Sequence, residues 1–68
     1  MLNIKDADII LFKQAVFQVD IDESKNRYAL LDLRKGDDFY NFRSYKRLCE
    51  CINNLINQGG TFHRPELA

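Results

Sequence analysis

The feature that most constrains this chain is an amphipathic helical pattern in its C-terminal half. Apolar side chains recur there at three- and four-residue spacing, at Tyr45, Leu48, Ile52, Leu55 and Ile56. This spacing predicts a helix with an apolar stripe about 100° wide, and Ser44 is a suitable N-cap. Gly59-Gly60 predicts its end, because glycine favours the left-handed conformation that closes helices. Such a stripe must be buried against another element, which the rest of the chain has to supply.

That element is predicted to be a β-sheet. From Ile9 to Ile21 the odd positions are mostly apolar, and residues 28–33 have β-like composition after the polar loop 23–27. Period-two alternation is typical of a half-buried strand, so we expect a hairpin. If Ile21 lies opposite Ala29, one face is apolar and buried and the other is solvated. The buried face would then carry Phe17, Val19, Leu31 and Leu33, and the solvated face Asp20, Asp22 and Asp32.

A third strand is expected over residues 39–42, after a turn at Gly36. In the predicted register Tyr40 pairs with Leu33 and Phe42 with Leu31, so both rings would point into the core. On the other face, a surface charge cluster is expected, formed by Arg43, Asp20 and Asp32.

The predicted fold class is therefore α+β, a three-stranded antiparallel sheet packed on one C-terminal α-helix in the order β-β-β-α. Residues 1–68 are expected to form a single small domain. Residues 60–68 are expected to be a flexible tail, because Pro65 disfavours regular structure. A domain of this size hides only about 60% of its unfolded surface, so self-association would add useful stability.

The cysteines and the one histidine do not suggest a metal site. Cys49 and Cys51 are two apart on the predicted helix, which separates them by about 200° around its axis. They cannot bridge to each other or chelate one ion together, and His63 alone cannot complete a tetrahedral site. We therefore predict no disulfide, no metal and no cofactor, and interpret both thiols as small, partly buried apolar groups.

Catalysis is not predicted either. His63 lies beyond the double glycine from both thiols, so no base is placed beside a nucleophile. Asp20 and Asp22 are interpreted as the solvated side of a sheet, and Asp37-Asp38 as turn residues. We expect no catalytic residues, no small-molecule substrate and no membrane insertion, since the longest apolar run, Ile9–Phe12, is short. Free thiols and the lack of a signal-peptide pattern predict a cytoplasmic protein.

The predicted pairing leaves residues 8–14 extending past the second strand. An unpaired strand of this apolar composition is an aggregation hazard, so something should cover it. It could bend near Lys13-Gln14, form a short helix capped by Asp6, or pair with a second copy or another protein. The favoured function is a non-enzymatic protein–protein interaction or regulatory domain that forms a homodimer. The predicted interface residues are Ile9, Ile10, Leu11, Phe12 and Val16.

The alternative function is a nucleic-acid-binding regulator. Ten Lys and Arg balance ten Asp and Glu overall, but residues 34–47 carry five basic side chains against two acids, interleaved with aromatics. The carboxylates expected on the outer sheet face would repel phosphate, so the outer helix face is the better candidate surface. The candidate contacts are Arg34, Lys35, Arg43, Lys46, Arg47, Asn53, Asn54 and Asn57.

Overall fold

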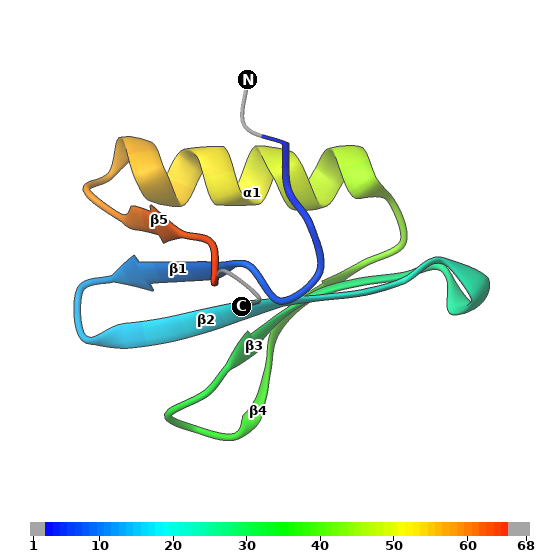
Figure 1. The fold of residues 1–68 in the computed structure, drawn as a ribbon, viewed down its shortest axis with the longest axis horizontal. Helices are drawn as coiled ribbons and strands as arrows, with labels where there is room; N and C mark the ends of the chain where they lie inside the picture. Colours follow the sequence, from blue (N-terminus) through cyan, green and yellow to red (C-terminus); the bar gives the residue numbers. More distant parts are fainter. Residues whose placement is uncertain (1–2, 66–68) are drawn as a thin grey trace.

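The computed structural model describes residues 3–65, which form one antiparallel sheet with a single α-helix packed on it (Figure 1). The helix, α1, spans Tyr45–Asn57. The spatial order of the strands is β4-β3-β2-β1-β5. Their bounds are β1 Ile9–Phe12, β2 Ala15–Asp22, β3 Arg27–Asp32, β4 Asp37–Phe42 and β5 Thr61–His63. The α+β class and the C-terminal helix on an antiparallel sheet are confirmed, but the sheet has five strands rather than three.

The first predicted strand is in fact a hairpin. The chain reverses at Lys13, whose φ is +55°, and β1 pairs with β2 so that Ile10 lies opposite Phe17 and Phe12 opposite Ala15. The bend near Lys13-Gln14 is therefore the alternative that forms, and no helix starts at Asp6. Residues 8–14 do not overhang, because β1 lies between β2 and β5.

The predicted register of β2 with β3 is wrong by one residue. Ile21 pairs with Tyr28 and Val19 with Leu30, because a 3-10 turn (Glu23–Lys25) and left-handed Asn26 close the loop one residue earlier. This shift turns β3 over. Leu30 and Asp32 face the helix, and Leu31 and Leu33 do not.

Asp32 tolerates its buried position because the β3–β4 turn surrounds its carboxylate with donors. The N–H groups of Arg34 and Lys35 donate to one of its oxygens at 3.0 and 3.1 Å. The predicted cluster of Arg43 with Asp20 and Asp32 does not form. Instead Arg27, the first residue of β3, bridges the two neighbouring strands and pairs with Asp20 on β2 and Asp38 on β4, both at 2.9 Å.

The core lies between α1 and the part of the sheet around β1, β2 and β3. Its fully buried side chains are Ile10, Val19, Leu30, Leu48 and Ile52. The helix begins after Ser44 and closes on Gly59 and Gly60, as predicted, with Gly60 N–H donating to the Leu55 carbonyl. A Cβ at Gly60 would stand 2.8 Å from that same oxygen and 3.2 Å from the Leu11 carbonyl oxygen of β1, so glycine is required where the chain passes between the helix end and the sheet.

The expectation of no regular structure after residue 60 is wrong for residues 61–63. β5 pairs with β1 and places Phe62 opposite Ile10, where its ring packs against the core. Residues 66–68 of the predicted tail lie outside the described residues. The sheet is therefore completed by two segments from opposite ends of the sequence.

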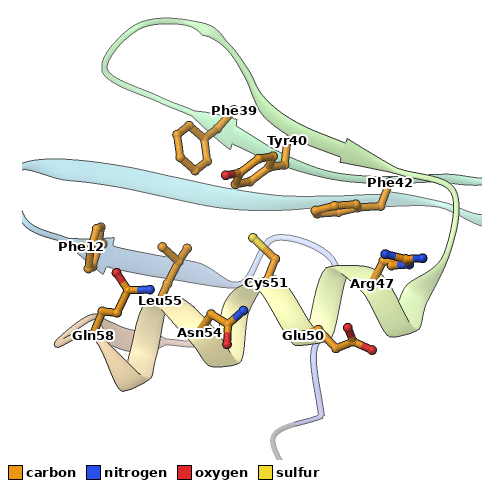
Figure 2. A pocket seen from close by; sticks show the side chains of 10 residues that line it. All are labelled: Phe12, Phe39, Tyr40, Phe42, Arg47, Glu50, Cys51, Asn54, Leu55 and Gln58. Carbon is orange, nitrogen blue, oxygen red and sulfur yellow. The ribbon is translucent and has the colours of Figure 1, made fainter.

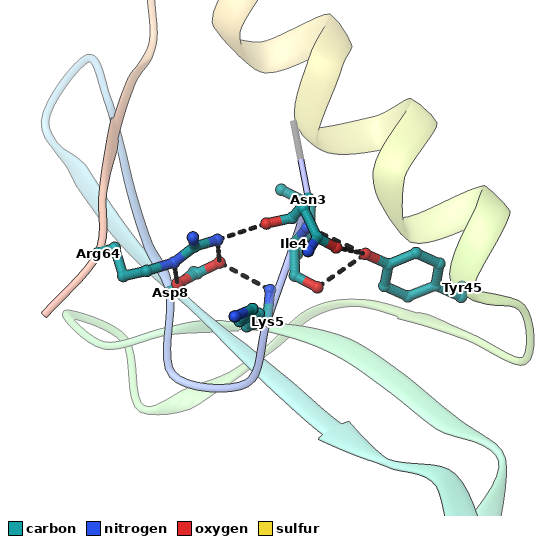
Figure 3. Close-up of polar contacts among 6 residues, drawn as sticks. All are labelled: Asn3, Ile4, Lys5, Asp8, Tyr45 and Arg64. Carbon is teal, nitrogen blue, oxygen red and sulfur yellow. Dashed lines mark hydrogen bonds and ion pairs between the residues drawn. The ribbon is translucent and has the colours of Figure 1, made fainter. Parts of the chain in front are cut away.

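A polar cluster ties these two segments together (Figure 3). The buried Asp8 carboxylate accepts hydrogen bonds from Arg64 Nε at 2.9 Å, Arg64 Nη2 at 3.0 Å and the Lys5 N–H at 2.7 Å. Arg64 also donates to the Asn3 carbonyl. Burial raises the pKa of Asp8, but the hydrogen bonds from Arg64 and Lys5 outweigh it and hold that pKa below its ordinary value.

Tyr45 anchors the same N-terminal segment to the start of α1. Its hydroxyl accepts from the Ile4 N–H at 3.0 Å and donates to the Ile4 carbonyl at 2.8 Å. The Ile4 side chain is thereby held in the core. Residues 3–8 thus close one side of the core.

Candidate functional site

An aromatic groove lies between β4 and α1 (Figure 2). An α-helix is about 10–12 Å wide, whereas five strands spaced about 4.8 Å apart span roughly 20 Å, so one helix cannot cover this sheet. The turn between β3 and β4 swings away from α1, and the hollow left there has a volume of about 520 Å³. The groove is lined by Phe12, Phe39, Tyr40, Phe42, Arg47, Glu50, Cys51, Asn54, Leu55 and Gln58.

A β-bulge brings three β4 rings to this one groove. Strict alternation would send Phe39 and Tyr40 to opposite faces. The register with β3 shifts between Leu30 and Leu31, so that Tyr40 pairs with Leu30 and Asp38 with Leu31, and Phe39 is the extra residue. Phe39 and Tyr40 both line the groove as a result, with 43% and 46% of their surface exposed.

The rings form a connected row that starts in the core. Phe39 stacks on the buried Phe17 at 4.5 Å between centroids, Tyr40 meets Phe39 edge-on at 4.5 Å, and Phe42 follows Tyr40 at 5.5 Å. Contact with Phe17 fixes one end of the row, and packing of Phe42 against the core fixes the other. The exposed rings are therefore held in place before any ligand arrives.

Cationic side chains stand at both ends of the row. Arg47 lies on α1 near Phe42, and Arg34 and Lys35 line the adjoining hollow that ends at Phe39. The opposite wall of the groove is mixed, since Cys51 and Leu55 point from α1 toward the sheet and Glu50, Asn54 and Gln58 project beside them. One wall therefore offers aromatic faces, and the other offers a charge and two amides beside apolar groups.

Cys51 also lines the groove, without the properties of a nucleophile. Burial raises the pKa of its thiol, so the thiol stays protonated near neutral pH. Among residues 3–65, no three His, Cys, Asp or Glu side chains come close enough together to hold a metal ion.

A second candidate surface is an apolar patch on the sheet face opposite α1. Cross-strand partners share a face, so Ile9 and Leu31 flank Gln18 in one row, and Leu11 lies beside Val16 in the next. Leu33 extends this second row, because its N–H donates to the Val16 carbonyl. Leu33 is 48% exposed and Leu11 36%. We call these five side chains the open-face patch: Ile9, Leu11, Val16, Leu31 and Leu33.

The predicted interface residues divide between the two sheet faces. Ile9, Leu11 and Val16 lie together in the open-face patch, whereas Ile10 is buried under α1 and Phe12 lines the groove. The argument that grouped all five rested on an unpaired strand, and β1 is paired on both sides.

The predicted nucleic-acid contacts are not brought onto one surface. Arg47 and Asn54 line the aromatic groove, and Arg34 and Lys35 lie at its far end. The remaining candidates line neither hollow: Arg43, Lys46, Asn53 and Asn57. The carboxylates of Asp20 and Asp22 lie on the face opposite α1, away from the aromatic row.

The groove rings and two patch residues were missed in the sequence. The predicted registers direct Tyr40, Leu31 and Leu33 into the core. A usable signal was present in Phe39-Tyr-Asn-Phe42, because three aromatics within four residues exceed what one face of a regular strand can hold.

No family model matches this chain, and neither does any curated protein or solved structure. None of the described helices has the length and apolar character needed to cross a membrane.

Proposed function

We propose that the protein is a non-enzymatic interaction domain that forms a homodimer through the open-face patch. The observation that carries this proposal is the patch itself, five apolar side chains gathered on a sheet face that no other described element covers. Antiparallel sheets commonly leave one face to water, but that face is then polar. A contiguous apolar group on a bare face is typical of a protein interaction site.

The surroundings of the patch support the same proposal. Toward the far end of β2 the face becomes polar, with Asp20, Asp22 and Arg27, and Thr61 and His63 border it on β5. An apolar centre with a polar rim is the usual anatomy of a protein interface. A two-fold axis through the patch would bury it against its own copy, sheet on sheet. Five side chains offer less than the about 800 Å² per partner of a standard interface, so we expect micromolar rather than nanomolar affinity.

Light scattering during size-exclusion chromatography, run over a range of concentrations, tests the proposal. The wild-type mass should approach twice the 8.0 kDa of one chain as concentration rises. Leu11→Glu with Leu33→Glu should give a folded species of single-chain mass, because the two-fold axis would bury like charges against each other. The matched control is Asn41→Glu, an exposed position on the same face outside the patch, which should behave as wild type.

Two results would contradict the proposal. One is a wild-type mass of a single chain even at submillimolar concentration. The other is a double variant that keeps its circular dichroism spectrum and remains dimeric, since the interface would then lie elsewhere. The second result would direct attention to β4, which is the longer of the two edge strands.

A further inference from the structure

We propose that the aromatic groove between β4 and α1 binds single-stranded nucleic acid, with bases stacked on the β4 rings and phosphates held by the cations at the two ends. This is a second function on a different surface and does not depend on dimer formation. The rings concerned are Phe39, Tyr40 and Phe42, and the cations are Arg47, Arg34 and Lys35.

The shape and chemistry of the two walls favour a base as the occupant. A base has flat aromatic faces and a polar edge. The groove has an aromatic wall on β4 and a mixed wall on α1, where Asn54 and Gln58 carry both donors and acceptors beside Leu55 and Cys51. An apolar peptide side chain would gain from the rings but would desolvate the amides and charges opposite them.

The rings are also ordered in the way that stacking requires. Phe39 and Tyr40 are nearly half exposed, yet each is fixed by a neighbouring ring at 4.5 Å. A base that stacks there does not have to order the side chain first, so more of the stacking free energy appears as affinity. The bulge that gathers the rings is a common device for aiming side chains at a ligand.

Charge completes the argument. A strand running along the row would have Arg47 at one end and Arg34 with Lys35 at the other, so its phosphates would meet cations on both sides of the stacked bases. The acids that line the groove or the adjoining hollow are Glu50 on α1 and Asp32 on β3. Three cations against two carboxylates give a small net attraction, so we expect weak, salt-sensitive and sequence-tolerant binding.

Fluorescence anisotropy with a labelled oligo-dT of about twelve nucleotides tests the proposal. Three phosphate contacts on a single strand give a salt slope of about −2, so affinity should fall roughly 20-fold between about 50 and about 200 mM salt. Oligo-U should bind about equally well, because the argument invokes no contact to the sugar. A blunt duplex hairpin should bind more weakly, because its bases are already stacked on each other.

Substitutions at Tyr40 distinguish stacking of a base on the ring from simple burial of apolar surface by the ligand. Tyr40→Phe should bind oligo-dT as wild type does, and Tyr40→Leu should weaken binding at least about fivefold, because leucine keeps an apolar side chain but has no π-face. Both variants should melt like wild type, which is to be checked first. If Tyr40→Leu binds as well as Tyr40→Phe, stacking is not the source of affinity and the proposal fails.

Substitutions at two adjacent positions on α1 distinguish binding in the groove from binding on the outer helix face. Arg47→Gln should weaken binding and reduce the salt slope by about 0.7, the share of one phosphate. Lys46→Gln, next to it but outside the groove, should have little effect. The reverse order of effects would place the site on the outer helix face and overturn the proposal.

The proposal would also be overturned if the folded wild-type protein bound no oligonucleotide at about 50 mM salt. A protein segment would then be the expected occupant of the groove. Leu11→Gln with Leu33→Gln, an uncharged form of the patch variant, should bind oligo-dT as wild type does. This variant distinguishes failure of the nucleic-acid proposal from failure of the dimer proposal.

Discussion

The two parts of the helix-facing side of the sheet are built from the same kinds of side chain but differ in what covers them. Around β1, β2 and β3, residues such as Ile10 and Leu30 have no exposed surface under α1. On β4, Phe39 and Tyr40 face the same side of the sheet and are nearly half exposed. The difference does not lie in hydrophobicity, since all four side chains bury apolar surface readily. It lies in the width of one helix compared with the width of five strands.

This comparison indicates where stability and where binding are expected to reside. Side chains under α1 lose their water on folding and contribute to the free energy of folding. The β4 rings keep part of their apolar surface exposed to water, and only a bound ligand would bury that part. Substitutions in the two parts should therefore separate stability from binding.

The largest expected effect is on stability, from cavities beneath the helix. Leu48→Ala or Ile52→Ala should each lower the free energy of unfolding by about 2–5 kcal/mol, because both side chains are fully buried and their removal leaves a void. Urea denaturation followed by circular dichroism measures this loss. A cost below about 1 kcal/mol at both positions would mean that α1 is not packed on the sheet as described.

An intermediate effect is expected from Asp8, which lies on the covered side. Its ionised form is favoured in the folded state, so the stability it adds is present above its unfolded pKa and is lost as pH falls through the lower, folded value. At neutral pH, Asp8→Asn should cost about 1–3 kcal/mol through lost hydrogen bonds from Arg64 and Lys5.

The pH dependence sharpens that test. In urea denaturation the difference between wild type and Asp8→Asn should shrink as pH falls below about 4, where the unfolded carboxyl becomes neutral, and on through the lower pKa of the folded carboxyl. Asp37→Asn, at an exposed position, is the control and should follow wild type. A difference that stays constant with pH would mean that the charge of Asp8 contributes nothing to stability.

The smallest effect on stability is expected on the uncovered strand. Tyr40→Ser should change the free energy of unfolding by less than about 1 kcal/mol, because nearly half of this side chain already lies in water. The same substitution should abolish most oligo-dT binding in the anisotropy assay. A loss of stability comparable to that of Leu48→Ala would show that the β4 rings belong to the core after all.

The helix was predictable because its signals are local and agree with each other. A suitable N-cap at Ser44, a stripe at three- and four-residue spacing and a double glycine all fall within one short segment. The bend after β1 was only one of several alternatives at the sequence level, because its local signal is weak. Lys13 adopts positive φ without being glycine, asparagine or aspartate, and the apolar alternation continues across it.

The candidate surfaces were harder to predict because they depend on register and on a bulge. A hairpin loop shorter by one residue exchanged the faces of Leu30 and Leu31, and the bulge then brought Phe39 and Tyr40 to the same side. The register shift leaves no mark in the composition of the strands, and the bulge is signalled only by the three aromatics of Phe39-Tyr-Asn-Phe42. The sequence showed that residues 34–47 are rich in aromatic and basic side chains. It did not show that some of these side chains line one groove.

The pairing of β5 with β1 has a consequence for the order in which the molecule folds. Hairpins β1–β2, β2–β3 and β3–β4 join neighbours in the sequence, whereas the Asp8–Arg64 contact closes a loop across 56 positions. Closing so long a loop is entropically unfavourable until other contacts exist. We therefore expect the hairpins to form early and the pairing of β5 with β1 to form last. Until then β1 is an exposed edge, and this intermediate is the form of the chain most prone to aggregation.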